Sequence, residues 1–205
     1  MDRPRAMGGA TQGSGSGPEG GSRGRKTTSE NNARRLTGNI KNCRTLRDLS
    51  QILHEQRGAL NHIHVSAAWV QLARIRSGRR GGEVNDAVAA LQDRTIDVLG
   101  QAGGREIANV MHSMAKLHEI GVRPDRGLLE AMQRRAMATA GEFKPQEAAI
   151  MLWALASMGE RVDRVLLEAM QKKATATAGE FNPQNVANLL WALATMGEKD
   201  RKSVV

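Results

Sequence analysis

Hydrophobic residues recur with helical spacing over most of the chain. They stand three or four positions apart, with polar residues between them, as expected for helices with one buried face. Four successive stripes run over 46–53, 63–75, 84–99 and 107–117, with breaks at 77–83, 100–104 and 121–124. Runs rich in β-branched residues are missing, and Ala, Leu and Met supply most of the apolar positions. The pattern therefore predicts an all-α protein.

The second half of the chain contains one motif twice. Residues 143–160 read FKPQEAAIMLWALASMGE, and residues 181–198 read FNPQNVANLLWALATMGE, 38 positions later. Weaker copies of the same helix lie at 107–117 and 65–75. A match of this length at a fixed period indicates a repeat. We therefore expect an α-solenoid of about four helix-pair repeats, each of about 38–42 residues.

Proline and glycine mark the expected helix ends. Proline suits the first helical turn, where its missing N–H costs nothing, so helices should begin at Pro145 and Pro183. Glycine suits a left-handed cap after the last turn. We expect such caps at Gly141, Gly159, Gly179 and Gly197.

The positive charge is concentrated near the N-terminus. Of the formal net charge of +9, residues 1–47 carry +7, from ten Lys or Arg and three acidic residues. The same region is rich in Gly and Ser, which cannot bury enough apolar surface to fold. We expect a disordered leader over 1–43, the solenoid over 44–198 and a tail over 199–205. A basic leader can attract nucleic acid or anionic membranes, or it can simply be solvated.

The sequence favours some classes of protein and excludes others. Cys43 is the single cysteine, so no intramolecular disulfide forms, and no apolar run is long enough to insert into a membrane. The Arg- and Ser-containing start weakly resembles a transit peptide, so an address to a chloroplast or mitochondrion is open, with the cytoplasm as the alternative. No catalytic arrangement is legible, so we expect no enzyme activity and no cofactor. Metal binding is not expected either, because no Cys accompanies His54, His62, His64, His112 and His118.

The repeated motif F-x-P-Q-x-x-A-x-x-L-W-A-L-A-x-M-G resembles the octotricopeptide repeat family. Its nearest likeness is to the algal chloroplast translation-factor-like members, which are related to the RAP and fast-kinase-like organellar RNA-binding proteins. The residues that carry the match are Phe143/Phe181, Pro145/Pro183, Gln146/Gln184, Trp153/Trp191 and Gly159/Gly197. The resemblance implies an RNA-binding α-solenoid that acts on organellar transcripts in processing, stability or translation. It implies single-stranded organellar RNA as the partner, with protein partners in a ribonucleoprotein complex.

Two other functions remain open at this stage. Helical-repeat proteins also serve as scaffolds that bind proteins. The chain can also be a truncated fragment of a larger repeat protein, since many relatives carry a RAP domain that is not found before Val205.

The two copies of the motif differ at a few positions that suit RNA recognition. In the last helix we expect Val186, Leu189, Leu190, Leu193 and Met196 to form the packing stripe together with Trp191. Residues 185, 188, 192 and 195 should lie on the opposite face. A reader of one base per repeat needs a constant frame with a few variable side chains. The candidate base readers are Asn185, Asn188, Glu147, Ile150, Glu106, Asn109 and His64. The alternative is that these are ordinary solvated positions.

Basic pairs and tryptophans offer further candidates. Placed toward a groove, four cations could contact phosphates, although Glu130 and Glu168 could pair with them instead. These cations are Arg134, Arg135, Lys172 and Lys173. Trp153 and Trp191 could stack on bases, but each lies inside the apolar LWALA segment, so the sequence favours a packing role.

Overall fold

The computed structural model describes residues 28–75 and 81–202, and there the chain is built from nine α-helices without a strand. This confirms the all-α prediction. The helices are α1 (Thr28–Asn42), α2 (Leu46–Glu55), α3 (His62–Ile75), α4 (Gly81–Val98), α5 (Gly104–His118), α6 (Arg126–Ala138), α7 (Pro145–Met158), α8 (Arg164–Ala176) and α9 (Pro183–Lys202). Short 3₁₀ turns join the two helices of each pair: η1 (Arg57–Ala59), η2 (Leu99–Gln101), η3 (Ala140–Glu142) and η4 (Ala178–Glu180).

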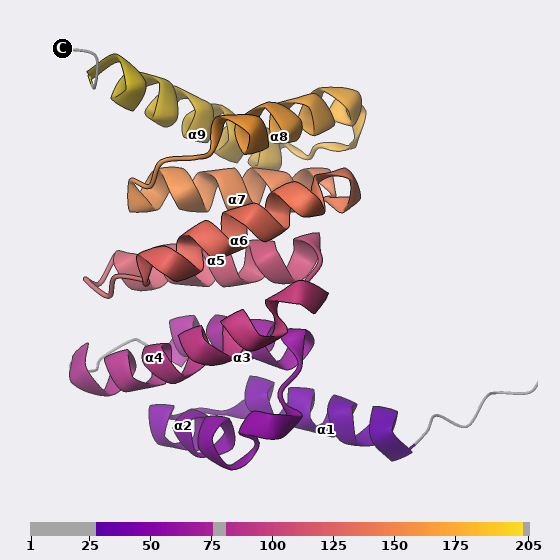
Figure 1. The fold of residues 1–205 in the computed structure, drawn as a ribbon, viewed down its shortest axis with the longest axis vertical. Helices are drawn as coiled ribbons and strands as arrows, with labels where there is room; N and C mark the ends of the chain where they lie inside the picture. Colours follow the sequence, from indigo (N-terminus) through magenta and orange to yellow (C-terminus); the bar gives the residue numbers. More distant parts are fainter. Residues whose placement is uncertain (1–27, 76–80, 203–205) are drawn as a thin grey trace, which may run out of the picture.

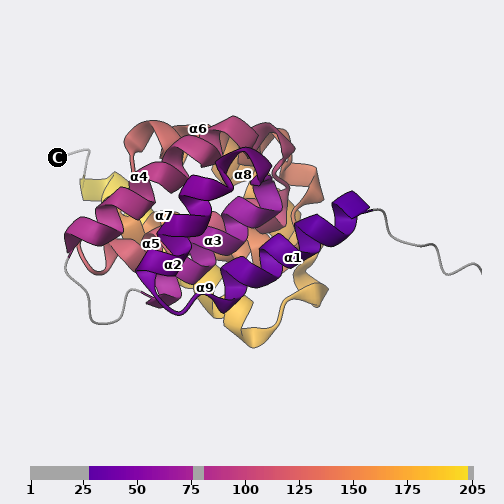
Figure 2. The same cartoon turned by 90° about the horizontal axis from the view of Figure 1, so that it is seen from below.

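The helices stack in two layers along the long axis of the molecule (Figure 1). Each odd-numbered helix packs against the next odd-numbered one, and α2, α4, α6 and α8 follow one another in the second layer. Figure 2, seen along the stack, shows α4, α6 and α8 on one side and α3, α5 and α7 on the other. The expected helix pairs correspond to α2–α3, α4–α5, α6–α7 and α8–α9.

The central odd-numbered helices are buried over most of their circumference. In α7 the side chains of Ala148, Leu152 and Leu155 are inaccessible to solvent, because α5, α8 and α9 all pack against this helix. Alanine lets helix backbones approach closely, while each buried leucine contributes about 1.5–3 kcal/mol. The LWALA segment therefore supplies the centre of the core.

A recurrent hydrogen bond joins successive repeats. Arg94 of α4 donates to the carbonyl of Leu60 at 2.9 Å, and Arg135 of α6 donates to the carbonyl of Ala102 at 2.9 Å. Lys173 of α8 makes a similar bond at 3.0 Å, but to the carbonyl of Gly141 within η3. In each case a cation on an even-numbered helix satisfies a backbone acceptor in the turn between the two helices of the preceding pair. The bond therefore fixes one repeat against the next.

The helix ends agree with the sequence in part. Helices begin at Pro145 and Pro183, and Gly159 caps α7 in the left-handed conformation at φ +76°, as predicted. The caps expected at Gly141 and Gly179 are wrong, because the chain there closes in the 3₁₀ turns η3 and η4. The cap expected at Gly197 is also wrong, because α9 continues through it to Lys202.

The first helix lies in a region where we expected a disordered leader. Helix α1 belongs to the odd-numbered layer and packs against α3, with Ile40 buried at the contact. Its apolar residues are few, so the sequence pattern did not reveal it. Residues 1–27 of the expected leader and residues 203–205 of the expected tail lie outside the described residues, as do residues 76–80, which overlap the break expected at 77–83.

Candidate nucleic-acid interface

One stripe of side chains on the odd-numbered helices stays open to solvent. It consists of three positions per helix, separated by three and then four residues, which places them on one face. The stripe, which we call the open stripe, comprises Ala67, Val70 and Arg74 of α3; Asn109, His112 and Lys116 of α5; Ile150, Trp153 and Ser157 of α7; and Asn188, Trp191 and Thr195 of α9. All twelve side chains are half-buried or exposed.

Packing on three sides creates this stripe. The residues on either side of His112 and Trp153 along the chain are buried: Met111 and Ser113 in α5, Leu152 and Ala154 in α7. A middle helix is covered by its two neighbours in the same layer and by the even-numbered layer behind it. Only the face turned away from the even-numbered helices remains for a ligand. The repeat therefore presents equivalent positions side by side on successive helices.

Two of the candidate base readers cap their own helices. The carboxylate of Glu147 accepts the backbone N–H of Lys144 at 2.9 Å, and that of Glu106 accepts the N–H of Gly103 at 3.2 Å. These bonds satisfy backbone donors at the starts of α7 and α5. The structure therefore gives Glu106 and Glu147 a structural role at the edge of the open stripe.

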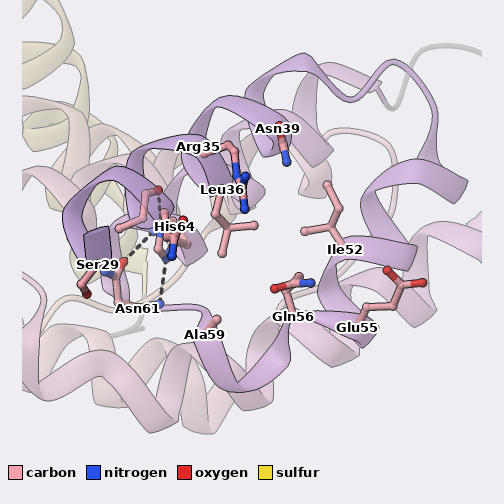
Figure 3. Close-up of a pocket in the computed structure, with 12 residues that line it drawn as sticks. Ser29, Arg35, Leu36, Asn39, Ile52, Glu55, Gln56, Ala59, Asn61 and His64 are labelled. Atoms are coloured by element: carbon pink, nitrogen blue, oxygen red, sulfur yellow. Dashed lines mark hydrogen bonds between the residues drawn. The ribbon is translucent and has the colours of Figure 1, made fainter. Parts of the chain in front are cut away.

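His64 and Asn185 occupy the same helix position and are buried. The expectation of a solvent-facing position is wrong for both, since their exposed fractions are 2% and 5%. His64 accepts the N–H of Asn61 on Nδ1 at 3.1 Å, so Nε2 carries the proton and donates to the Ala33 carbonyl at 2.9 Å. The ring thus caps α3 and holds α1 in place (Figure 3). Neither side chain can meet a base without displacement.

A cavity of about 630 Å³ opens beside His64, between α1 and the α2–η1 segment (Figure 3). Leu36 and Ile52 provide its apolar lining, and Arg35, Asn39 and Gln56 provide polar groups. A guanidinium and two amides offer hydrogen-bond donors to a polar ligand. The sequence analysis missed this site because it placed α1 in the leader.

Three other candidate base readers lie on the open stripe. Asn109, Ile150 and Asn188 are half-buried at equivalent positions of α5, α7 and α9. The Asn109 amide donates to Ser66 Oγ at 3.4 Å, and the Asn188 carbonyl oxygen accepts the Gln184 amide at 3.2 Å. Both amides keep further hydrogen-bonding capacity, because an Asn side chain has two donors and two acceptor lone pairs. This column therefore fits the expected variable position on an open face.

Trp153 and Trp191 both lie on the open stripe. Trp153 is half-buried and packs against the hydrophobic core, so the packing role that the sequence favoured is right in part for this residue. That role is wrong for Trp191, which is exposed. The Trp153 ring lies 5.3 Å from the His112 ring, centroid to centroid, with an interplanar angle of 38°. Lys116 Nζ lies 5.1 Å from the same indole centroid, within the range of a cation–π contact. Trp191 is 48% exposed. Trp69 is the buried tryptophan, and its N–H donates to Thr95 Oγ1 at 2.9 Å.

The packing stripe expected on α9 is wrong in part, and so is the opposite face, because Ala192 is completely buried. Val186 and Leu190 are 41% and 62% exposed, whereas their equivalents Ala148 and Leu152 in α7 are buried. Helix α9 covers that face of α7, and the structure describes no further helix that covers the same face of α9. The last helix therefore exposes an apolar surface that the repeat normally buries.

The candidate phosphate contacts divide into two kinds. Arg135 and Lys173 are half-buried and donate to backbone carbonyls, as described above, so they hold the repeats together. Arg134 and Lys172 are exposed, but they lie on the even-numbered helices, away from the open stripe. The acids expected to pair with them bond elsewhere: Glu130 to Arg126 and Glu168 to Arg164.

Cys43 has the environment of a structural thiol. It is buried, and its Sγ donates to the Asn39 carbonyl at 3.3 Å. Burial raises the pKa of the Cys43 thiol, and the nearby carboxylate of Asp48 raises it further. The thiolate fraction at neutral pH is therefore small, which makes this cysteine a poor nucleophile.

Comparison with known proteins leaves the open stripe as the main functional evidence. A scan against protein-family models and a search of curated proteins found no match to this chain. In the described part of the chain, none of the helices combines the length and the apolar composition that a membrane crossing requires. The function therefore has to be inferred from the residues of the chain itself.

Proposed function

We propose that this chain is an RNA-binding helical-repeat protein that acts on organellar transcripts in processing, stability or translation. The observation that carries the proposal is the open stripe, in which equivalent positions of four helices differ from one another. The column Ala67, Asn109, Ile150, Asn188 changes along the stack. The residues that flank its two middle positions along the chain are buried and apolar: Ala108 and Val110 in α5, Ala149 and Met151 in α7. A constant frame with a few variable exposed side chains is what base-by-base recognition requires.

The chemistry of the open stripe suits single-stranded RNA. Amides such as Asn109 and Asn188 can pair with base edges, and tryptophan and histidine rings offer stacking surfaces. Arg74 and Lys116 place positive charge one turn beyond the aromatic column, where Arg74 could contact phosphates; Lys116 is paired with Glu119 at 2.6 Å and would have to exchange this partner. The stripe carries only these two cations, so we expect a shallow salt dependence from the folded part and a larger contribution from the basic leader.

The test is a fluorescence anisotropy titration of the full chain with labelled single-stranded RNA at increasing salt. We expect binding at low salt, weaker binding at high salt, and a clear preference over a duplex of the same sequence. Equal affinity for the duplex and the single strand would count against the open stripe as the contact surface. No binding even at low salt would contradict the proposal.

The organellar part of the proposal is supported by the family resemblance and by the composition of the N-terminus. Import of the full chain into isolated chloroplasts and mitochondria would test it. We expect protection from added protease in one organelle. Recovery in the cytosolic fraction only would contradict this part of the proposal without affecting RNA binding.

A second candidate function is a protein-binding scaffold, which the exposed apolar face of α9 favours. Val186 and Leu190 correspond to residues that are buried by the next helix pair within the chain. The partner that fits is therefore an apolar helix of the same repeat type. A complex that is recovered after RNase treatment and is lost in Leu190→Lys would support this function over RNA binding.

A further inference from the structure

The aromatic column of the open stripe deepens the proposed function, on which the following inference rests. We propose that Trp191 and Trp153 form a stacking platform for unpaired bases of single-stranded RNA, with Trp191 as the most accessible step. The column consists of Val70, His112, Trp153 and Trp191 at equivalent positions of α3, α5, α7 and α9. It therefore becomes aromatic toward the C-terminal half of the stack.

Exposure is the first reason for this assignment. A tryptophan is among the most strongly apolar side chains, and burying it would stabilise the fold. Trp69 shows that this chain can do so, since it is 1% exposed and hydrogen-bonded inside the core. Trp191 is 48% exposed on a helix that buries Ala192 completely. An indole held in solvent beside a small buried residue is suited to a ligand with a flat apolar face.

The environment of Trp153 is the second reason. His112 lies 5.3 Å away and Lys116 approaches the ring to 5.1 Å, so α5 holds the indole from one side. A ring ordered before binding loses less side-chain entropy when a base stacks on it. A base inserted between these two rings would need about 3.4 Å on each side. The ring centroids are 5.3 Å apart, so no base fits between them. The base therefore stacks on the part of the indole that remains exposed.

The spacing of the helices favours single-stranded RNA over a duplex as the ligand. The axes of packed helices lie about 8–10 Å apart, so the backbone positions that carry Trp153 and Trp191 are spaced more widely than stacked bases in a duplex, which are about 3.4 Å apart. One strand can splay its bases so that each meets a separate ring, whereas a duplex keeps its bases covered. Stacking of this kind tolerates any base, since each base has an aromatic face. We therefore expect the platform to add affinity, and Asn109 and Asn188 to add the discrimination between bases.

The first experiment measures the affinity of the full chain and its variants for a labelled single-stranded RNA of mixed sequence. Trp191→Leu should weaken binding by about 5- to 150-fold, the loss that one base–aromatic stack represents. Trp191→Phe should retain most of the affinity, because phenylalanine still stacks. Leu190→Ala is the matched control: this neighbour is 62% exposed on α9 but lies outside the open stripe, so its variant should bind as the wild type does.

A second readout uses the tryptophans themselves. RNA should quench the fluorescence of the wild type through Trp153 and Trp191. In the double variant Trp153→Phe, Trp191→Phe the RNA should still bind by anisotropy, but the quenching should vanish, because Trp69 is buried. Circular dichroism of each variant establishes that it is folded.

The outcomes separate this inference from the proposed function. Wild-type protein that binds RNA, together with Trp191→Leu of equal affinity and tryptophan emission that RNA leaves unchanged, would overturn the stacking platform and leave RNA binding standing. Wild-type protein without affinity for any single strand would overturn both. A loss of affinity that is as large in Leu190→Ala as in Trp191→Leu would also overturn the platform, since it would assign the contact to the apolar face of α9.

Discussion

Gly104 lies against the ring of Phe143, the phenylalanine that opens the repeated motif. A Cβ atom on Gly104 would come within 3.0 Å of Phe143 Cγ and 2.7 Å of Glu147 Oε2. Phe143 is 1% exposed, and the Glu147 carboxylate is held by its bond to the Lys144 N–H. The start of α5 is therefore shaped to receive the turn that precedes α7.

Gly104→Ala should destabilise the protein by overfilling this contact. The added methyl forces either the buried ring or the capping carboxylate to move, which we expect to cost about 1–3 kcal/mol. Gly100→Ala is the control, because a Cβ atom there meets nothing within 4 Å. Urea unfolding of both variants checks the prediction. Equal midpoints for Gly104→Ala and the wild type would show that the contact relaxes freely.

Arg135→Met should destabilise the protein, whereas the same change at its exposed neighbour Arg134 should not. The substitution keeps most of the aliphatic stem but removes the donor to the Ala102 carbonyl, leaving a buried acceptor unsatisfied. Hydrogen bonds from charged groups contribute about 1.5–3 kcal/mol, so we expect a loss of stability in that range. Arg134→Met, one residue away and exposed, should change stability by less than about 0.5 kcal/mol.

The same two variants also test whether the hydrogen bond of Arg135, and not its charge, stabilises the protein. The melting temperature of Arg135→Met should fall while that of Arg134→Met stays near the wild type. An equal loss in both would mean that general electrostatics, and not the bond between repeats, sets the stability. RNA affinity should be similar in the two folded variants, because neither cation lies on the open stripe.

The sequence was sufficient for the helices of the second half and for half of the ends that it marked. Pro145, Pro183 and Gly159 act locally, through a missing donor and a permitted left-handed conformation, so their roles do not depend on the neighbours. The repeat period then implied the stacking of pairs. These features could be predicted because each follows from a few adjacent residues.

The orientation of the tryptophans could not be predicted in the same way. In α7 apolar residues fill almost every position, so the pattern contains no polar side that marks the solvent. Because α7 is buried on three sides, its solvent-facing stripe is too narrow to give an amphipathic pattern in the sequence. Trp153 therefore looked like a core residue. Only the positions of α5 and α9 show which face of the helix remains open.

Helix α1 illustrates a different limit. Its contact with α3 depends on Ile40 and on the hydrogen bond between His64 and the Ala33 carbonyl, 31 positions apart. Such long-range contacts leave little trace in local composition. The polar residues of α1 resemble those of a leader, so a search for apolar stripes missed this helix.

His64→Ala should loosen α1 without unfolding the stack. The variant removes the acceptor of the Asn61 N–H and the donor to Ala33, and we expect a local loss of about 1–3 kcal/mol. Hydrogen exchange followed by mass spectrometry should show faster exchange over 28–42, with α5 to α9 unchanged. His54→Ala, at an exposed position of α2, is the control. Unchanged protection of α1 would show that its apolar contacts, through Leu36 and Ile40, secure it without this hydrogen bond.

Leu152→Ala and Leu190→Ala test the repeat itself, because the two leucines occupy equivalent positions with opposite environments. Leu152 is completely buried beneath α9, so its truncation should cost about 2–5 kcal/mol. Leu190 is 62% exposed, so its truncation should cost less than about 0.5 kcal/mol in the isolated protein. Thermal unfolding at low and high protein concentration measures both values. A large effect of Leu190→Ala that grows with concentration would show that this face of α9 is covered in solution by a second molecule.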